Sequence, residues 1–320
     1  MKPFKTILNM TTYHLDPRRR SLSQTFVLLS LTLLGPVIGP QLASAETVLE
    51  KVARTGTLTA GTSQEALPFA FANDQGELQG YSVDMLKLIQ AQLTKELGKK
   101  VELKLTVLNP EDRIPKIIAG EVDIVCDASS YTWERDKQID FSVSYGITGT
   151  RLLVKKDSGE WEPARLANKR IAAIATTTNE LAIRRAQPQA QIVLVKDHAE
   201  GYEALKQGTV DAFAADDILL EGWLQTIDNP GDFQVVGYFS KEGIACMMPE
   251  NNSPFVYQVN YSLVRFMQGY LQGKEPYVKI FERWFGSQAK VPLTQDLRAL
   301  VLETMQLVID FKEEIPESEL

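Results

Sequence analysis

Two stretches of the chain share one local scheme, "DRIPKIIAGEVDIVCDASS" (residues 112–130) and "GYEALKQGTVDAFAADD" (residues 201–217). Each predicts a short helix, a glycine that ends the helix, and then a strand that ends in polar residues. In an open α/β sheet, ligands bind outside the carboxyl ends of the strands. The sequence therefore predicts two such edges, one at residues 127–130 and one at Asp216, with a cleft between two lobes.

Strand-like and helix-like runs alternate along the rest of the chain. "GTLTAGT" (56–62) and "VELKLTVL" (101–108) read as strands, and residues 81–98 between them place apolar side chains on one helical face. This alternation predicts an α/β fold with largely parallel sheets. Residues 254–285 look helical. An amphipathic run at 297–311 should pack back on the body, with a partner-binding helix as the alternative.

The chain also indicates where the lobes join. "GTRLLVKK" (149–156) is a strand that leads into a polar stretch, and the strand-rich passage 233–249 could carry the chain back. We therefore expect a discontinuous first lobe, residues 46–150 and 241–320, with the second lobe inserted as residues 151–240.

The first 45 residues read as an export signal. A basic start is followed by an apolar run at residues 26–38 and by an A-S-A cleavage site, so we expect cleavage after Ala45. The apolar run is shorter than the roughly 20 residues that a membrane-spanning helix needs, which makes a permanent anchor the weaker interpretation. The sequence predicts a soluble, periplasmic product.

Charge and length narrow the function of this product. Residues 1–45 hold five of the 34 basic and one of the 41 acidic residues, so 29 basic and 40 acidic residues remain, a net charge of −11. Such an acidic chain is not expected to bind nucleic acid. A length of about 275 residues exceeds the usual size of a single core, which agrees with two lobes.

The chain contains two cysteines, Cys126 and Cys246, and both lie in the exported part. An oxidising compartment favours a disulfide between them, and two buried thiols are the alternative. The two cysteines and two histidines of the chain have no metal-ligand spacing. We expect neither a metal nor another cofactor.

Seven fragments occur in an order that is typical of a known family: "PFAFANDQGELQGYSVD", "DRIP", "VDIVCDASSYTWERDKQIDFS", "GTRLLV", "KDHAEGYEAL", "VDAFAADDILLEG" and "ERWF". On these fragments the chain resembles the periplasmic amino-acid-binding proteins of ABC importers, extracellular solute-binding protein family 3, and most of all its glutamate/aspartate-binding branch. The resemblance implies a two-lobed periplasmic binding protein fold of type II. It also implies a monomer that captures a free amino acid and delivers it to a membrane permease.

The resemblance places the family's clamp for the ligand's α-carboxylate on Arg135 and Ser130. A guanidinium suits this task because its planar fork can donate two parallel hydrogen bonds to a carboxylate. The alternative is a surface arginine that pairs with Glu134 or Asp136.

The second lobe is expected to bind the other end of the ligand. "IAAIATTTNEL" (171–181) reads as a strand, a loop and a helix start, where free amides favour an anion. The resemblance assigns a ligand-contacting hydroxyl to Thr178, and helix capping is its alternative role. Asp216 matches the family's acceptor for the α-ammonium group. Its alternative role is to cap the next helix, which Asp217 could do instead.

The residues that would select the ligand's side chain match the branch only in part. Arg113 and His198 match its distal contacts, although His198 beside Asp197 could be an exposed loop histidine. Three positions differ from the arginine and two serines of that branch: Ser63, Pro110 and Ala128. Ala66 stands where other branches stack an aromatic ring. Since loss of an arginine weakens attraction for a second carboxylate, the expected ligand is glutamate, aspartate or a related polar amino acid.

Two other functions are the alternatives to binding and transport. An exported enzyme on the same scaffold, a dehydratase or lyase for an amino-acid-like acid, would use Glu65 or Asp127 as a general acid, but neither has an obvious partner at acid/base spacing. A ligand-sensing receptor would need a transmembrane or signalling segment after the binding region. The chain lacks the GxxxxGK[ST] phosphate loop, so ATP hydrolysis is not expected. The sequence predicts a binding protein and not an enzyme.

Overall fold

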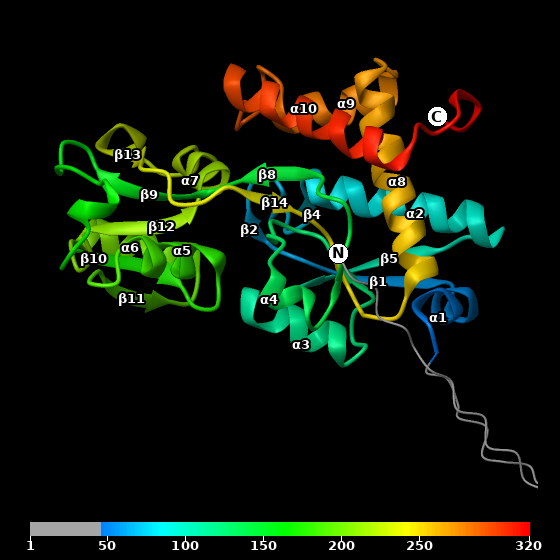
Figure 1. Cartoon of the computed structure of the whole chain (residues 1–320), viewed down its shortest axis with the longest axis horizontal. Coiled ribbons are helices and arrows are strands. Elements are labelled where there is room, and N and C mark those ends of the chain that lie inside the picture. Colours follow the sequence, from blue (N-terminus) through cyan, green and yellow to red (C-terminus); the bar gives the residue numbers. More distant parts are fainter. Residues whose placement is uncertain (1–45) are drawn as a thin grey trace, which may run out of the picture. The chain divides into compact units, whose positions relative to one another are not determined.

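The computed structural model describes residues 46–320. The predicted export signal and its cleavage site after Ala45 lie outside the described residues. Two five-stranded sheets with covering helices make up most of residues 46–320, and a three-stranded and a two-stranded sheet complete them (Figure 1). No helix of this part is both long and apolar enough to cross a membrane. It also contains no group of three or more acidic, His or Cys side chains that could hold a metal ion.

The first sheet has the strand order β5-β1-β6-β15-β7. Its strands are β1 (Thr57–Thr62), β5 (Glu102–Val107), β6 (Ile124–Val125), β7 (Asp140–Phe141) and β15 (Met247–Met248). β1 runs parallel to β5 and β6, whereas β15 runs antiparallel to β6 and β7. The helices associated with this sheet are α1 (Val48–Thr55), α2 (Tyr81–Leu97), α3 (Arg113–Ile118), α4 (Trp133–Asp136) and α8 (Ser253–Leu271).

The second sheet has the order β11-β10-β12-β9-β13. Its strands are β9 (Thr150–Lys155), β10 (Arg170–Ile174), β11 (Gln191–Val195), β12 (Ala212–Asp216) and β13 (Phe233–Val236). β10 is parallel to β11 and β12, and β9 is antiparallel to β12 and β13. Its helices are α5 (Thr178–Ala186), α6 (His198–Gln207) and α7 (Asp217–Leu224).

The predicted α/β class is confirmed, but the sheets are mixed and not largely parallel. Each sheet has two parallel and two antiparallel strand pairings. Parallel neighbours need a crossover connection, usually a helix. The two segments that carry the chain between the sheets, around β8 (Gly146–Thr148) and β14 (Glu242–Ile244), contain no helix. Each segment enters its sheet at the edge where the parallel strands end, so β9 runs antiparallel to β12 and β15 runs antiparallel to β6.

Both helix–glycine–strand units that the sequence predicts are present. Gly120 follows α3 and precedes β6, and Gly208 follows α6 and precedes β12. The two glycines have φ of 70° and 74°, a left-handed conformation that side chains with a Cβ adopt at a cost. The units bring residues 127–130 and Asp216 to the carboxyl ends of their strands.

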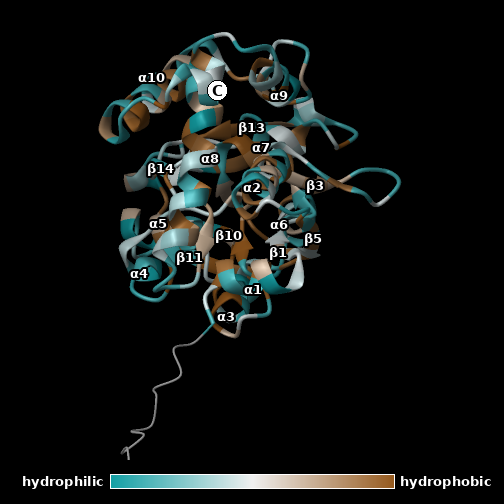
Figure 2. Cartoon of the chain, turned by 90° about the vertical axis from the view of Figure 1, so that its right-hand side faces the viewer, coloured by the Kyte–Doolittle hydropathy of each residue, from teal (hydrophilic) through white to brown (hydrophobic). Residues whose placement is uncertain are grey.

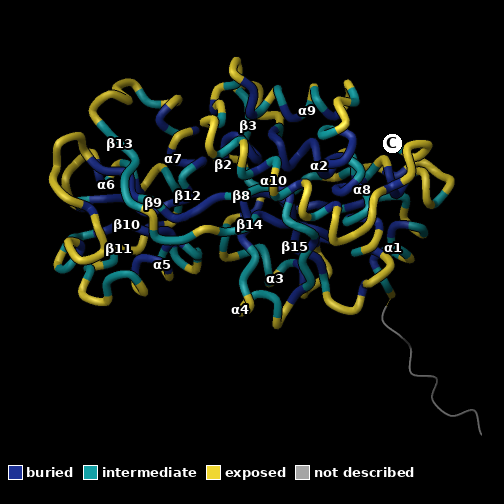
Figure 3. The backbone as a smooth tube through the Cα atoms, turned by 45° about the horizontal axis from the view of Figure 1, so that its top comes forward, coloured by how far each residue is buried: buried dark blue, intermediate teal, exposed yellow. Residues whose placement is uncertain are grey.

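Four apolar clusters form the cores. Two pack on the first sheet and its helices, and two lie on the two faces of the second sheet. Hydrophobic residues are concentrated in strands such as β10, while α1 and α4 are largely hydrophilic (Figure 2). Burial follows the same division, with exposed residues mainly in the loops (Figure 3).

Helix α7 contributes side chains to the cores of both five-stranded sheets. Its Ile218 and Leu219 pack into the cluster of the first sheet, whereas Leu220 and Leu224 pack into one cluster of the second sheet. One eight-residue helix therefore joins the two halves of the described chain.

The chain passes between the two sheets twice, and the two passages pair with each other. β8 on the way out is antiparallel to β14 on the way back. The boundaries expected at residues 150/151 and 240/241 fall close to this pair of strands. The exact division into lobes 46–150 with 241–320 and 151–240 stays a prediction.

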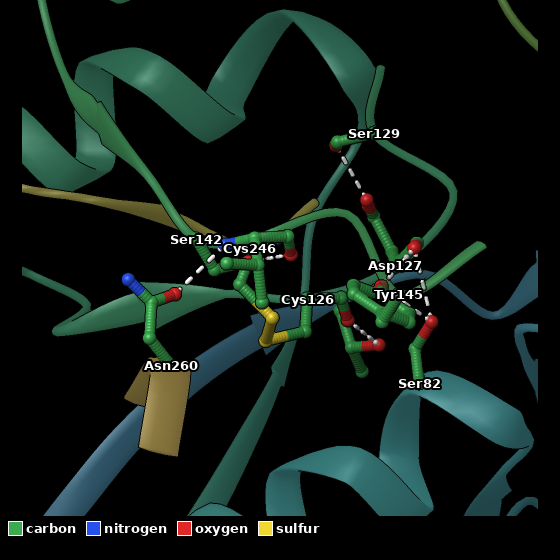
Figure 4. The surroundings of a disulfide bond; sticks show 10 residues. Ser82, Cys126, Asp127, Ser129, Ser142, Tyr145, Cys246 and Asn260 are labelled. Atoms are coloured by element: carbon green, nitrogen blue, oxygen red, sulfur yellow. Dashed lines mark hydrogen bonds between the residues drawn. A yellow bond between two sulfur atoms is a disulfide. The ribbon is translucent and has the colours of Figure 1, made fainter. Parts of the chain in front are cut away.

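A disulfide joins the outgoing and returning parts of the first sheet. Cys126 directly follows β6, and Cys246 directly precedes β15. Their Sγ atoms are 2.03 Å apart, and 120 residues separate them in the chain (Figure 4). The structure thus contains the disulfide and not the two thiols that the sequence left as an alternative.

The C-terminal part is helical and packs on α8. The segment expected as helical at 254–285 consists of α8 and α9 (Glu275–Phe285), separated at Gly273, which has φ of 72°. The amphipathic run forms α10 (Gln295–Lys312), whose buried Val301, Met305 and Ile309 join the core of the first sheet. This packing agrees with the first of the two roles expected for that run.

Candidate functional site

The structure brings all the predicted site residues to one pocket of about 760 Å³, a volume that includes the space open to solvent. The six predicted residues in its lining are Arg113, Ser130, Arg135, Thr178, His198 and Asp216. The four positions that depart from the family's branches, Ser63, Ala66, Pro110 and Ala128, also line it. The pocket lies at the carboxyl ends of β6, β10 and β12, where the repeated sequence scheme places it.

Arg135 reaches across the pocket from the short helix α4. Its Nη1 donates to the carbonyl of Ser130 at 2.9 Å, and its Nη2 donates to the carbonyl of Thr176 at 3.4 Å. Thr176 follows β10 of the second sheet and has a left-handed φ of 63°, which is uncommon for threonine. Both walls of the pocket are therefore in contact through Arg135.

Arg135 does not pair with its acidic sequence neighbours, so the alternative of a surface ion pair is wrong. Glu134 pairs with Lys137, and Asp136 accepts from the Tyr131 hydroxyl. Burial, with Arg113 nearby, lowers the pKa of Arg135 from its ordinary value. Since desolvation makes a lone cation costly, an anion placed against this guanidinium would be favoured.

Asp216 ends β12 and is nearly fully buried. Its Oδ1 accepts from Asn179 Nδ2 at 3.0 Å, and it has no ion-pair partner among residues 46–320. Burial, with Glu242 and Asp217 nearby, raises the pKa of Asp216 well above its ordinary value, and Arg113 and Arg135 oppose this rise. A cation placed beside Asp216 would therefore favour its charged form.

The capping role that was the alternative for Asp216 falls to its neighbour. Asp216 occupies the N-cap position of α7, but its side chain makes no capping hydrogen bond. Asp217 Oδ1 accepts instead from the amide of Ile218 at 2.7 Å and from Thr148 Oγ1 at 2.9 Å. The carboxylate of Asp216 is left to face the pocket.

Thr178 is the first residue of α5, at the N-terminus that faces the pocket. Thr177 is the N-cap, and its Oγ1 accepts from the amide of Glu180 at 3.4 Å. The capping role therefore belongs to Thr177 and not to Thr178. Free amides and the dipole of the helix add a positive potential at this point of the wall.

Arg113 begins α3 and forms a buried ion pair. Its Nε lies 2.7 Å from Asp127 Oδ2, and the two side chains are 12% and 0% exposed. Its Nη1 donates to Ser129 Oγ at 3.3 Å. Ser129 Oγ in turn donates to Asp127 Oδ1 at 2.5 Å (Figure 4). Asp127, one of the two acids considered for an enzyme, is thus the counter-ion of Arg113.

His198 is a helical, partly buried residue and not an exposed loop histidine. It begins α6, after Asp197, whose carboxylate caps the helix by accepting from the Glu200 amide at 2.8 Å. Its ring meets the ring of Phe213 edge to face, with centroids 5.9 Å apart. Burial, followed by the charge of Arg113, lowers the pKa of His198 to about 4. The imidazole is therefore neutral at neutral pH.

Sequence reasoning missed the polar side chains that support Asp216. Asn179 Oδ1 lies 3.5 Å from Thr150 Oγ1, which accepts from Ser240 Oγ at 2.9 Å. Ser240 also hydrogen-bonds to Glu242 on the returning passage. Asn179 carries no distinctive local signal, because it lies in the first turn of α5, near the cap positions that asparagine favours. Thr150 is 29 positions from Asn179 and 90 positions from Ser240, so no local pattern predicts these contacts.

The sequence matches the profile of the bacterial extracellular solute-binding proteins, family 3, over residues 58–287. It is 31% identical over 296 residues to the L-glutamate/L-aspartate-binding protein of Pseudomonas aeruginosa, with 88% of this chain and 95% of that protein covered. It is 28% identical over 248 residues to the glutamate/aspartate import solute-binding protein of Escherichia coli, with 76% and 80% covered.

Solved structures show the same fold. An ancestral arginine-binding protein bound to glutamine has a TM-score of 0.64 at 28% identity, covering 72% of this chain and 99% of the other. The ancestral amino acid-binding protein AncCDT-1, a precursor of cyclohexadienyl dehydratase, has a TM-score of 0.63 at 25% identity, with 74% and 99% covered. These similarities agree with the two-lobed fold that the strand order shows.

Proposed function

Because the chain belongs to the bacterial extracellular solute-binding proteins, family 3, we propose that it captures a free α-amino acid and delivers it to the permease of an ABC-type importer. Its relatives support an amino-acid ligand, since they are named as binding proteins for glutamate and aspartate, for glutamine and for L-cystine. Export with cleavage after Ala45, a periplasmic location and action as a monomer belong to the same proposal.

The observation that carries the proposal is the pair of opposite charges on opposite walls of the pocket. Arg135 has only carbonyl partners, and Asp216 has only an amide partner, within residues 46–320. The carboxylate and ammonium groups of an α-amino acid supply the two missing counter-charges at once. Ser130 and Thr178 would add hydroxyl contacts to the same zwitterion.

The energy of a few such contacts is sufficient for capture. A hydrogen bond to a charged group contributes about 1.5 to 3 kcal/mol, and micromolar affinity needs about 8 kcal/mol. Four or more contacts shared between Arg135 and Asp216 reach this range even after some ordering cost. Because the contacts lie on both walls, the bound amino acid would favour the closed arrangement of the lobes.

The lobes that close are proposed to meet at the paired strands β8 and β14. Lobe 1 would comprise residues 46–150 and 241–320, and lobe 2 residues 151–240. Two short antiparallel strands can bend at their ends while the sheets on either side move as rigid bodies.

We propose binding without turnover. Asp127 is engaged by Arg113. Glu65 is an exposed residue whose pKa is raised, mainly by partial desolvation, and no hydrogen-bonded base lies beside it among the described residues. No contact in the pocket favours the dehydratase or lyase alternative over binding.

A thermal-shift screen of the mature protein against the common L-amino acids, followed by titration calorimetry, tests the proposal. A ligand at 100 times its Kd should add about 2.7 kcal/mol to the free energy of unfolding. Arg135→Ala should weaken binding about 100-fold or more, because the ligand carboxylate loses a charge-assisted partner. Arg165→Ala is the control, since Arg165 is exposed and pairs only with Glu160. Equal affinity of the Arg135→Ala variant and the parent would refute the clamp.

A further inference from the structure

We propose that Asp127 neutralises Arg113, so that the distal end of the pocket takes an uncharged, hydrogen-bonding side chain, such as the carboxamide of glutamine, in preference to a second carboxylate. This inference rests on the proposed function, in which Arg135 and Asp216 bind the α-carboxylate and α-ammonium groups. It concerns only the part of the ligand beyond its α-carbon.

The ion pair between Arg113 and Asp127 is buried, and it is the first step of the argument. The 2.7 Å contact between Arg113 Nε and Asp127 Oδ2 involves a carboxylate with no exposed surface. For Arg113 to serve a ligand carboxylate as a free cation, Asp127 would have to remain as a buried, unpaired charge. Such a charge costs several kcal/mol, which exceeds the gain from one surface-accessible contact.

Asp127 cannot turn away from Arg113, because its side chain and backbone are both held. Ser129 Oγ donates to its Oδ1, and its carbonyl accepts from Tyr145 Oη at 2.5 Å and from Ser82 Oγ at 3.0 Å (Figure 4). The adjacent Cys126 is fixed by the disulfide. The negative charge of Asp127 is therefore held at a fixed position in the pocket wall.

The other charged groups of the distal end add no free positive charge. Lys196 Nζ lies 3.7 Å from Asp197 Oδ2, and His198 is neutral because burial lowers its pKa to about 4. Glu65 contributes a carboxyl without an ion-pair partner among residues 46–320. Of the cationic side chains that line the pocket, only Arg135 has no carboxylate partner in the described chain, and it serves the α-carboxylate.

The groups that remain are suited to a carboxamide. Arg113 still offers guanidinium N–H donors, Glu65 offers acceptors, and the neutral ring of His198 can either donate or accept. A carboxamide carries one acceptor oxygen and two N–H donors, so it can satisfy groups of both kinds. A carboxylate is an acceptor only and would lie close to Asp127 and Glu65.

Titration calorimetry at pH 7 with L-glutamine, L-asparagine, L-glutamate, L-aspartate and L-arginine tests this inference. We expect the parent protein to bind glutamine or asparagine at least about tenfold more tightly than either acidic amino acid or arginine. A tighter Kd for glutamate, aspartate or arginine would overturn the inference while leaving the α-amino-acid clamp intact.

Asp127→Asn is the informative variant, because it keeps the shape of the side chain and removes its charge. The affinity ratio of glutamate to glutamine should rise at least about tenfold. Asp211→Asn is the matched control: it breaks another Asp–Arg pair, with Arg170 at 2.6 Å, outside the pocket lining. This control should have the same affinity ratio of glutamate to glutamine as the parent protein.

The outcomes separate the two proposals. An unchanged ratio in Asp127→Asn would refute the role of Asp127. If Asp127→Asn does not fold, the preference of the parent protein decides the inference on its own. If no amino acid binds, or if Arg135→Ala binds as the parent does, the proposed function itself fails.

Discussion

At the scale of single residues, Asp216 is the group whose chemistry should respond most to a ligand. Its raised pKa has a clear cause in burial, and the charges that face it come from four elements: Glu242 on β14, Asp217 on α7, Arg113 on α3 and Arg135 on α4. In the ligand-free protein, burial disfavours the charged form of this acid. A bound ammonium group would favour the charged form instead.

Binding should therefore release a proton from Asp216. Because the folded pKa is raised, the stability contributed by this group is present below the ordinary carboxyl pKa and is lost as the pH rises through the raised pKa. A ligand ammonium lowers the pKa of Asp216. Affinity should therefore increase with pH in the range between the pKa of Asp216 in the complex and its pKa in the free protein. Calorimetry in two buffers of different ionisation enthalpy measures the released proton.

The Asp216→Asn variant provides the control for this proton release. It should bind more weakly and give the same heat in both buffers after correction for dilution. If the parent protein also gives equal heats in the two buffers at a pH just below the raised pKa, Asp216 is not the ammonium acceptor.

The residue scale also shows where sequence reasoning is sufficient and where it is not. The sequence predicts Arg135 and Asp216 as site residues because the family resemblance assigns them there, and because Asp216 ends one strand while Arg135 comes after another. The pairing of Arg113 with Asp127 could not be predicted, since it depends on the orientation of α3 relative to β6. The contact of Asn179 with Asp216 likewise depends on how α5 packs against β12.

At the scale of secondary-structure elements, α7 couples the two halves of the described chain. A Cβ added at Gly222 would meet the carbonyl oxygen of Leu67 at 2.5 Å, and Leu67 belongs to the core of the first sheet. A helix of the second sheet thus approaches the backbone of the first half so closely that only glycine fits. This contact should depend on how the lobes are closed.

Gly222→Ala should weaken both the stability of the closed form and the affinity for ligand. Overpacking of this kind costs about 1 to 3 kcal/mol, because a backbone carbonyl cannot move aside as a flexible side chain can. Gly231→Ala is the matched control, since a Cβ there meets nothing within 4 Å. Urea unfolding and calorimetry of both variants check the prediction, and identical results for the two would contradict it.

The order of elements was largely predictable, while strand length and direction were less so. Helix α2 was visible from its apolar face and terminal glycine, and α10 from its amphipathic pattern. β6 and β15 are only two residues long, too short for any periodicity. Their antiparallel pairing follows from the edge at which the returning chain enters the first sheet, a tertiary feature that no window of sequence contains.

At the scale of the whole described chain, function arises because two sheets present their carboxyl ends to one pocket. The Arg135 guanidinium comes from α4, beside the first sheet, and the Asp216 carboxylate comes from β12 of the second sheet. The seven ordered fragments were sufficient to predict the family and the fold class, because they cover both halves of the chain. The identity of the amino acid was not predictable, because it depends on which charges in the pocket are already neutralised.

The most direct test of the shared zwitterion is a crystal structure of the mature protein with the amino acid that gives the largest thermal shift. The ligand's carboxylate should lie about 2.7 to 2.9 Å from the Arg135 guanidinium, and its ammonium group at a similar distance from the Asp216 carboxylate. A ligand bound outside this pocket, or bound with either of these side chains turned away from it, would contradict the account.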